Sequence, residues 1–537
     1  MPRCELSLVE LDSVKQYIDV RGKYLDYLND ESGIVKEGNA DRIFFPTSID
    51  ELQIVISAAV KQEIKYTISG GGTGISGGRV PYEGWIIATD EMTTIASSSS
   101  SRWKDPETGQ EYSYQLNEAG ETAYLTVPIA MRLKSVQNLC RELGWFYPPD
   151  PTERSSFIGG NVATNASGAR TFKFGTTRDW CQQLTVILPD GRKIHLNRDG
   201  DLHQLTADRI ILQVGEDQIN IPRPTYKLPQ SRKNVAGPVL TDSSQPIDLF
   251  IGTGGMFGVV AEITLKLRRP PGAQASLFVF TRSRADAIKV IETTQLHRHE
   301  QKEPIPMAVE YLGPRAVEIM RQEDHNISND AESLIMLEQD AESDEQMMDY
   351  LENWWELFAE MDVLDTMVAQ SYDEIEHHKF LRHKVPETVN ALVRSYGQAK
   401  LGTDCAVPES QLAWLFDQAF AVGKEFEAYQ WDRQPLDKGE FGYAVWAHAG
   451  DSHVHLNLLP RNDEEDEQAK SFVTKLLKEV VAKHGTIAAE HGLGKKEFDH
   501  QPALLLQYGT NGMDQIRAMK LAIDPKELLN SGNLIPI

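Results

Sequence analysis

Histidines gather near the C-terminal end of the chain, in the segment HAGDSHVHLN. A single histidine on a strand is more often a hydrogen-bonded core residue than a metal ligand. Alternate residues of a strand share a face, so His453 and His455 lie together, and the bend before them can bring His448 round to meet His455. Two imidazoles with one carboxylate suit a divalent metal, and Glu490 in TIAAEHGLGKKEF is the candidate carboxylate. The glycines after Glu490 and His491 predict a turn that exposes both side chains.

A glycine-rich loop, SGGGTGISGG at residues 69–78, is a second site with chemical potential. Its glycines fit the GxGxxG pattern of a nicotinamide-binding Rossmann site, and Asp90 stands near the spacing of a ribose-binding acid. Such a site needs a helix N-terminus directed at the pyrophosphate, whereas Pro81 and Gly84 prevent a helix after this loop. Successive backbone N–H groups of small residues still form an anion-binding nest, so the loop is interpreted as a phosphate cradle, with a plain tight turn as the alternative.

A further stretch of small residues lies within residues 147–180, YPPDPTERSSFIGGNVATNASGARTFKFGTTRDW. It combines consecutive prolines, a Gly-Gly-Asn turn and a run of small residues from Ala163 to Gly168. A core helix would not be built from such residues, so the backbone there is expected to approach a flat or charged ligand.

Composition restricts the class of protein. The 537 residues carry 54 basic and 79 acidic side chains, a formal net charge of −25, which disfavours nucleic acid or an anionic membrane surface as the main partner. The four cysteines lie far apart and form no CxxC pair, so neither a disulfide framework nor a thiolate metal site is indicated. The N-terminus is charged where a signal peptide would be apolar, and no uncharged apolar run of about 18 residues follows. We therefore expect no transmembrane segment and a cytoplasmic location, with peripheral attachment to a membrane left open.

Patterning predicts mixed helices and strands that must position these sites. Ser48 and Glu51 form a capping box ahead of a helical repeat, which is followed by a strand and then by the glycine loop. The polar stretches 97–115 and 221–246 are expected to be surface loops. The acidic span 323–362 predicts solvated helix faces. From about residue 440, a histidine-rich strand precedes a helix, a glycine turn and a C-terminal helix.

Several ordered motifs between residues 40 and 268 resemble the FAD-binding domain of the vanillyl-alcohol oxidase and p-cresol methylhydroxylase (PCMH/VAO) superfamily: SGGGTGISGG, PPDPTE, IGGNVATNASG, FGTTRDW and IGTGGMFGVVAEITLKL. The resemblance implies an α+β fold and non-covalent FAD, because the loop lacks the histidine that some relatives attach to flavin. Where relatives commonly carry Ser-Glu-Gly-Thr, this chain has TGGM at residues 253–256. The FAD neighbours implied by the resemblance are Gly70, Gly71, Gly72, Thr73, Gly74, Gly77, Pro149, Gly159, Gly160, Thr164, Ser167, Gly168, Gly258, Val259, Val260, Asn530 and Asn533.

The C-terminal part resembles the FAD-linked oxidase C-terminal domain, in which GHxGDGNxH and EHGxG segments surround the substrate, as in D-lactate and D-2-hydroxyglutarate dehydrogenases. The resemblance implies that His448, His455 and Glu490 hold a divalent metal and that His491 is the catalytic base. Imidazole and carboxylate ligands without a thiolate favour zinc, and manganese or iron would accept the same set.

Two departures and two further residues complete the predicted site. Ser452 and His453 stand where the family pattern has Gly-Asn. Arg382 and Lys400 stand at about the places where the family has the arginine and lysine that bind a substrate carboxylate. For both of these basic residues, an exposed charged helix is the alternative interpretation.

The resemblance implies an N-terminal helical segment at 1–39, a PCMH/VAO-type FAD-binding domain at 40–268, an antiparallel-sheet-and-helix substrate or cap domain at 269–484, and a segment at 485–537 that packs back on the FAD domain. The predicted reaction oxidises a small 2-hydroxy acid, of the D-lactate or D-2-hydroxyglutarate type, to the 2-oxo acid by hydride transfer to flavin N5. A quinone, a flavoprotein or oxygen would accept the electrons, and a homodimer is compatible with the prediction. Two alternatives stay open: an enzyme like alkyl-dihydroxyacetone-phosphate synthase, and a non-catalytic FAD-binding subunit of an oxidase complex.

Overall fold

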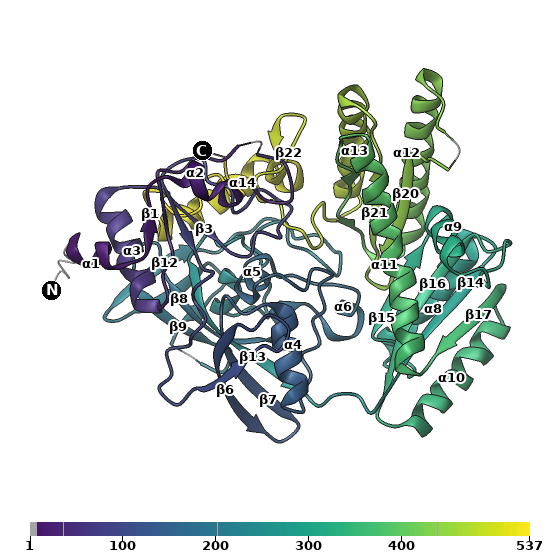
Figure 1. The fold of residues 1–537 in the computed structure, drawn as a ribbon, viewed down its shortest axis with the longest axis horizontal. Helices are drawn as coiled ribbons and strands as arrows, with labels where there is room; N and C mark the ends of the chain where they lie inside the picture. The colour runs from purple at the N-terminus through teal and green to yellow at the C-terminus, as the bar shows by residue number, and fades with distance from the viewer. Residues whose placement is uncertain (1–7, 36, 201, 438, 537) are drawn as a thin grey trace.

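The computed structural model describes residues 8–35, 37–200, 202–437 and 439–536, and the chain forms two lobes that lie side by side (Figure 1). The first lobe contains the N-terminal half, drawn in purple, blue and teal. The second lobe contains the segment from β14 (Ala273–Thr281) to α13 (Asp463–Ala482). The C-terminal segment, drawn in yellow, leaves the second lobe and returns to the first.

The first lobe begins with a four-stranded sheet in the order β1 (Gln16–Tyr17), β2 (Arg42–Phe44), β4 (Trp85–Ala88) and β3 (Tyr66–Ser69), of which β2, β4 and β3 are parallel. Of the predicted N-terminal helical segment, residues 1–7 and 36 lie outside the described residues, and the remainder holds the short helices α1 (Leu8–Ser13) and α2 (Val20–Lys23) besides β1.

Helix α3 (Ile49–Gln62) links β2 to β3 and starts where the sequence predicts. Ser48 Oγ accepts a hydrogen bond of 3.2 Å from the backbone N–H of Glu51, which caps the helix. The residues between β3 and β4 are all described and form no helix, so the Rossmann interpretation is excluded by the fold as well as by Pro81 and Gly84.

A larger antiparallel sheet follows in the first lobe. Its order is β5 (Ser101–Lys104), β6 (Glu111–Ala119), β7 (Thr122–Pro128), β13 (Val259–Arg268), β8 (Cys181–Ile187) and β9 (Lys193–Asn197). The helices α4 (Leu133–Glu142), α5 (Ile158–Thr164), α6 (Thr171–Phe174) and α7 (Thr177–Trp180) lie between β7 and β8, and a small sheet contains β10 (Gln204–Leu205), β11 (Arg209–Val214) and β12 (Asp217–Pro222). The prediction of a surface loop at 97–115 was wrong, because β5 and most of β6 occupy this range and β6 pairs with β7.

The second lobe is built on one antiparallel sheet in the order β17 (Val363–Ala369), β14, β16 (Ser333–Ala341), β15 (Ala308–Leu312), β20 (Tyr443–His448), β21 (His453–Leu458) and β18 (Leu401–Gly402), with β19 (Cys405–Ala406) also paired to β21. The helices of this lobe are α8 (Arg284–Glu300), α9 (Pro314–Glu323), α10 (Asp344–Ala359), α11 (Tyr372–Ser395), α12 (Leu412–Arg433) and α13. The acidic span 323–362 is therefore only partly helical: the buried strand β16 lies inside it, between α9 and α10.

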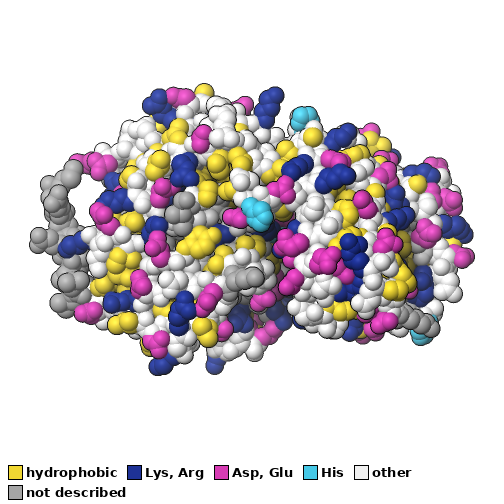
Figure 2. All heavy atoms as spheres, turned by 90° about the horizontal axis from the view of Figure 1, so that it is seen from above, with side chains coloured by type: hydrophobic (Ala, Val, Ile, Leu, Met, Phe, Trp, Pro, Cys, Tyr) yellow, Lys and Arg dark blue, Asp and Glu magenta, His cyan; other side chains and the backbone are white. Residues whose placement is uncertain are grey.

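The C-terminal segment forms β22 (Glu497–Phe498), β23 (Gln501–Pro502) and α14 (Ala503–Ile523), and its last residues attach to the first lobe. Tyr66 N donates to Leu528 O at 2.8 Å, and Ile68 N donates to Asn530 Oδ1 at 2.8 Å. Within the described part of the chain, no helix has both the length and the apolar character needed to cross a membrane. On the face seen in Figure 2, acidic and basic side chains of the described residues are interspersed rather than collected into a basic patch.

Candidate active site

A cavity of about 660 Å³ lies between the glycine-rich segments of the first lobe and the C-terminal segment. Its walls include the loop after β3, the start of α5, the segment before β13, and the turn that contains Glu490 and His491. Of the residues that the sequence assigns to FAD, the following line it: Gly70, Gly71, Gly72, Thr73, Gly74, Gly159, Gly160, Thr164, Ser167, Gly258, Val259, Val260, Asn530 and Asn533.

Three of the residues assigned to FAD are not among those that line the cavity: Gly77, Pro149 and Gly168. Gly77 has a φ of 75° and donates its backbone N–H to Asp30 Oδ2 at 2.7 Å. A Cβ at Gly168 would lie 2.2 Å from the backbone oxygen of Asp150, so packing within the lobe accounts for that glycine.

Three glycines on the cavity wall have no structural reason to be glycine. At Gly70, Gly74 and Gly160, φ lies outside the left-handed region and an added Cβ would meet no atom within 4 Å. Gly72 differs, because its φ is 80° and a Cβ would lie 1.8 Å from Arg79 Nη1. At these positions no side chain separates the backbone from the cavity, which fits a cofactor that carries phosphates and a flat ring.

The predicted histidines converge in the second lobe because two strands bring them together. Strands β20 and β21 pair in an antiparallel register that places His448 opposite His453 and Trp446 opposite His455. The tight connection between the strands contains Ser452, whose φ of 53° is the left-handed conformation that favours the glycine of the family pattern.

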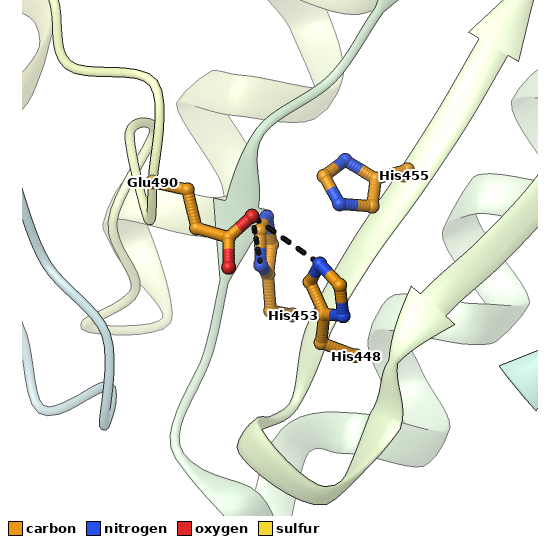
Figure 3. Close-up of side chains that lie close together, drawn as sticks. All are labelled: His448, His453, His455 and Glu490. Carbon is orange, nitrogen blue, oxygen red and sulfur yellow. Dashed lines mark ion pairs between the residues drawn. The ribbon is translucent and has the colours of Figure 1, made fainter. Parts of the chain in front are cut away.

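Glu490 reaches these histidines from the turn after α13 (Figure 3). His448 Nε2 lies 3.2 Å from Glu490 Oε2, and one ligand atom from each of His448, His453, His455 and Glu490 lies within 4.8 Å of all the others. The described residues therefore fit a divalent metal, and they include His453, which the sequence did not assign as a ligand.

The acidic residue Glu310 on β15 supports the cluster. Its carboxylate contacts His448 Nδ1 and accepts a hydrogen bond of 3.0 Å from Arg382 Nη2. Burial lowers the pKa of His448, but Glu310 and Glu490 outweigh it and raise this pKa to about 9. A metal that binds His448 would therefore compete with a proton for this ring.

Asp404 supports the other side of the site. It lies 3.0 Å from His453 Nε2 and 3.5 Å from His491 Nδ1, and its carboxylate accepts the backbone N–H of His491 at 2.8 Å. Burial lowers the pKa of His491 while Asp404 opposes that effect, and the net pKa is below the ordinary value. His491 is thus neutral near pH 7, and it lines the cavity with its side chain 32% exposed.

Lys233 is a fully buried cation that sequence reasoning missed. Its Nζ donates to Glu490 Oε1 at 2.6 Å and lies 3.5 Å from Asp451 Oδ2, and its side chain is 0% exposed. Burial lowers the pKa of Lys233, but Glu490 and Asp451 outweigh it, so the net pKa is raised. Residues 223–245 form no helix or strand, as the sequence predicts, but the predicted surface position is wrong at Lys233, which is buried. The two carboxylates compensate the charge of this lysine.

Arg382 and Lys400 lie near the histidine strands rather than on the cavity wall. Arg382 is held by Glu310, which also contacts His448. Lys400 Nζ lies 4.9 Å from the ring centroid of Trp446, and among the described residues it forms no ion pair. Burial, with the charge of Arg382 as a second cause, lowers the pKa of Lys400 to about 8. A desolvated cation without an anion is a candidate site for a substrate carboxylate.

Both domains match known families. Residues 40–197 match the FAD binding domain, and residues 271–534 match the FAD linked oxidases, C-terminal domain. This chain belongs to the FAD-linked oxidases. It is accordingly an FAD-dependent oxidoreductase, built as the expected FAD-binding domain of PCMH/VAO type with an antiparallel sheet and helices beside it.

Named relatives of this FAD-linked oxidase cover nearly its whole length. D-lactate dehydrogenase of Anaerostipes hadrus is 24% identical over 531 residues, which is 95% of this chain and 92% of that protein. D-2-hydroxyglutarate dehydrogenase of Stutzerimonas stutzeri is 25% identical over 92% of this chain and 90% of its own length. Glycolate oxidase subunit GlcD of Bacillus subtilis is 24% identical over 92% and 88%. The solved structure of an alkyldihydroxyacetonephosphate synthase superposes with a TM-score of 0.63 at 13% identity, over 99% of this chain and 86% of that one, which shows a shared fold.

Proposed function

We propose that this FAD-linked oxidase is a dehydrogenase that oxidises a small 2-hydroxy acid, of the D-lactate or D-2-hydroxyglutarate type, to the 2-oxo acid. One observation carries the proposal: Glu490 belongs to the histidine cluster and, with its neighbour His491, also lines the glycine-walled cavity. A substrate at this junction would touch both the cluster and the cofactor. The names of the relatives support the substrate class.

FAD would lie in the cavity against the open glycines, and a divalent metal would be held by His448, His455 and Glu490. When bound, FAD would accept a hydride from C2 of the substrate, and the metal would polarise the substrate hydroxyl. His491 would accept the hydroxyl proton; its lowered pKa and Asp404, 3.5 Å from its Nδ1, support this role.

The substrate carboxylate would bind to Lys400, with Arg382 as the second cation. Lys400 has no carboxylate partner of its own among the described residues, whereas Arg382 is already engaged by Glu310. Arg382 would therefore hold Glu310 in position beside His448 as well as bind the substrate. Removal of the hydroxyl proton and a hydride leaves the 2-oxo acid, and the two electrons would pass on to a quinone, a flavoprotein or oxygen.

Anaerobic mixing of the FAD-loaded protein with D-lactate, D-2-hydroxyglutarate or glycolate tests the proposal. At least one of these acids should bleach the flavin absorption, and prior chelation should slow the bleaching. Full retention of oxidised flavin with all three acids, and with their L-enantiomers where these exist, would refute it. An enzyme like alkyl-dihydroxyacetone-phosphate synthase would instead act on a long-chain lipid substrate without net flavin reduction. A non-catalytic subunit would react neither with the hydroxy acids nor with the lipid substrate.

A further inference from the structure

His453 stands where the family pattern has asparagine, and it lies between the two histidines to which that pattern assigns the metal. We propose that His453 is a fourth protein ligand, so that this chain holds its metal with three imidazoles and one carboxylate. The inference rests on the metal site of the proposed function and adds a ligand that the pattern does not contain.

The position of the ring supports the proposal. His453 is 0% exposed, and its ring centroid lies 4.2 Å from that of His455 and 5.3 Å from that of His448. Its Nδ1 lies 3.9 Å from Glu490 Oε2, on the side that Figure 3 shows facing the carboxylate. All four residues thus turn one donor atom toward a common centre.

The opposite nitrogen of each ring faces a protein oxygen. His448 Nδ1 contacts Glu310, His455 Nδ1 lies 3.0 Å from the backbone oxygen of Thr403, and His453 Nε2 lies 3.0 Å from Asp404 Oδ1. Metal-ligating histidines in proteins almost always show this arrangement, because an oxygen acceptor fixes the tautomer that leaves the other nitrogen free for the metal. His453 has an oxygen at the same place, although its contact with Asp404 lacks the hydrogen-bond geometry of the other two.

The inward nitrogen of His453 has no other use in the described structure. Among the described residues, neither ring nitrogen of His453 makes a hydrogen bond of good geometry, although the side chain is fully buried. A buried polar atom without a partner is costly, and nearly all such atoms in proteins are paired. A metal at the common centre would supply the missing partner of Nδ1.

The fourth ligand changes which metals suit the reaction. Catalytic zinc sites commonly have three protein ligands and keep the fourth tetrahedral position for water or substrate. With four protein ligands, a substrate oxygen must enter as a fifth or sixth ligand. Mn²⁺, Fe²⁺ and Co²⁺ accept that number more readily than Zn²⁺, so the preference for zinc that three ligands suggest would not hold for this chain.

Mn²⁺ is a suitable probe, because oxidised flavin has no electron paramagnetic resonance signal. FAD-loaded protein is freed of metal with a chelator and titrated with Mn²⁺, and pulsed resonance counts the directly coordinated nitrogens. Wild type should show three imidazole nitrogens. His453→Asn, which installs the residue of the family pattern, should show two, and its Kd for Mn²⁺ should rise by about 10- to 100-fold or more. His297→Asn is the matched control, since His297 is 3% exposed and lies outside the cluster.

The outcomes separate the two proposals. Two coordinated nitrogens in wild type, or an unchanged Kd in His453→Asn, would overturn the assignment of His453 and leave the three-ligand metal site and the dehydrogenase standing. An FAD-loaded wild type that binds no Mn²⁺, Zn²⁺ or Co²⁺ would overturn the metal site together with the fourth ligand. Should His453→Asn fail to retain FAD, the nitrogen count in wild type still decides.

Discussion

Gly160 allows a sharp test of the FAD cavity, because the fold does not need a glycine at this position. It lies inside α5, and a Cβ would meet no atom within 4 Å. Gly160→Ala removes a glycine from a helix interior, so the free energy of unfolding of the flavin-free protein should rise by about 0.5–1 kcal/mol. The same methyl group would project into the cavity, where an overpacked contact typically costs about 1–3 kcal/mol. FAD should therefore bind about 5- to 150-fold more weakly.

Gly160→Ala should thus change two measured quantities in opposite directions: the stability of the flavin-free protein should rise, and the affinity for FAD should fall. Urea unfolding of the flavin-free protein reports the stability, and a fluorescence titration with FAD reports the affinity. Gly159→Ala is the matched control, because its Cβ would lie 2.9 Å from Cβ of Ile129 and should lower the stability of the flavin-free protein. If Gly160→Ala binds FAD as tightly as wild type, the flavin does not lie against α5. If the variant is less stable than wild type, the position is not open as described.

Three further predictions concern charges at the site. The pKa of Lys400, lowered to about 8 by burial and by Arg382, means that this cation is lost as pH rises; kcat/KM for a 2-hydroxy acid should fall above about pH 8, and Lys400→Arg should extend the plateau upward. An identical pH profile in both proteins would exclude that role. His491→Asn should lower flavin reduction in stopped flow by about 100- to 10,000-fold with FAD retained, whereas an unchanged rate would rule out the base. Lys233→Met leaves Glu490 and Asp451 as buried carboxylates without this cation, so urea unfolding should show a loss of about 3–5 kcal/mol; a loss under about 1 kcal/mol would mean that other groups compensate them.

The parts of the site that could be predicted from the sequence are those set by local periodicity. His448, His453 and His455 come together because they lie on two consecutive strands joined by a short bend. The helix at α3 was likewise predictable from one cap and one repeat of apolar residues.

The supporting residues could not be predicted, because their partners are distant in the sequence. Glu310 lies 138 residues before His448, and Lys233 lies 257 residues before Glu490. Nothing near Lys233 marks it as buried, since the polar composition of 221–246 is typical of an exposed loop. The sequence shows that His453 differs from the asparagine of the family pattern. The proposal that it is a ligand also depends on Asp404, which contacts it from the segment between β18 and β19.

The carboxylate of Glu490 joins three parts of the molecule: it lies 3.2 Å from His448 Nε2 in the second lobe and is bonded to Lys233 and Ser167 in the first. A bond network of this kind makes loading of the two components reciprocal. If bound FAD orders the cavity wall that carries Ser167 and so raises the affinity for the metal, the bound metal must raise the affinity for FAD by the same factor. A protein that already carries one of the two components then binds the other more tightly than a protein that carries neither, so neither component's affinity is a fixed property of its own lobe.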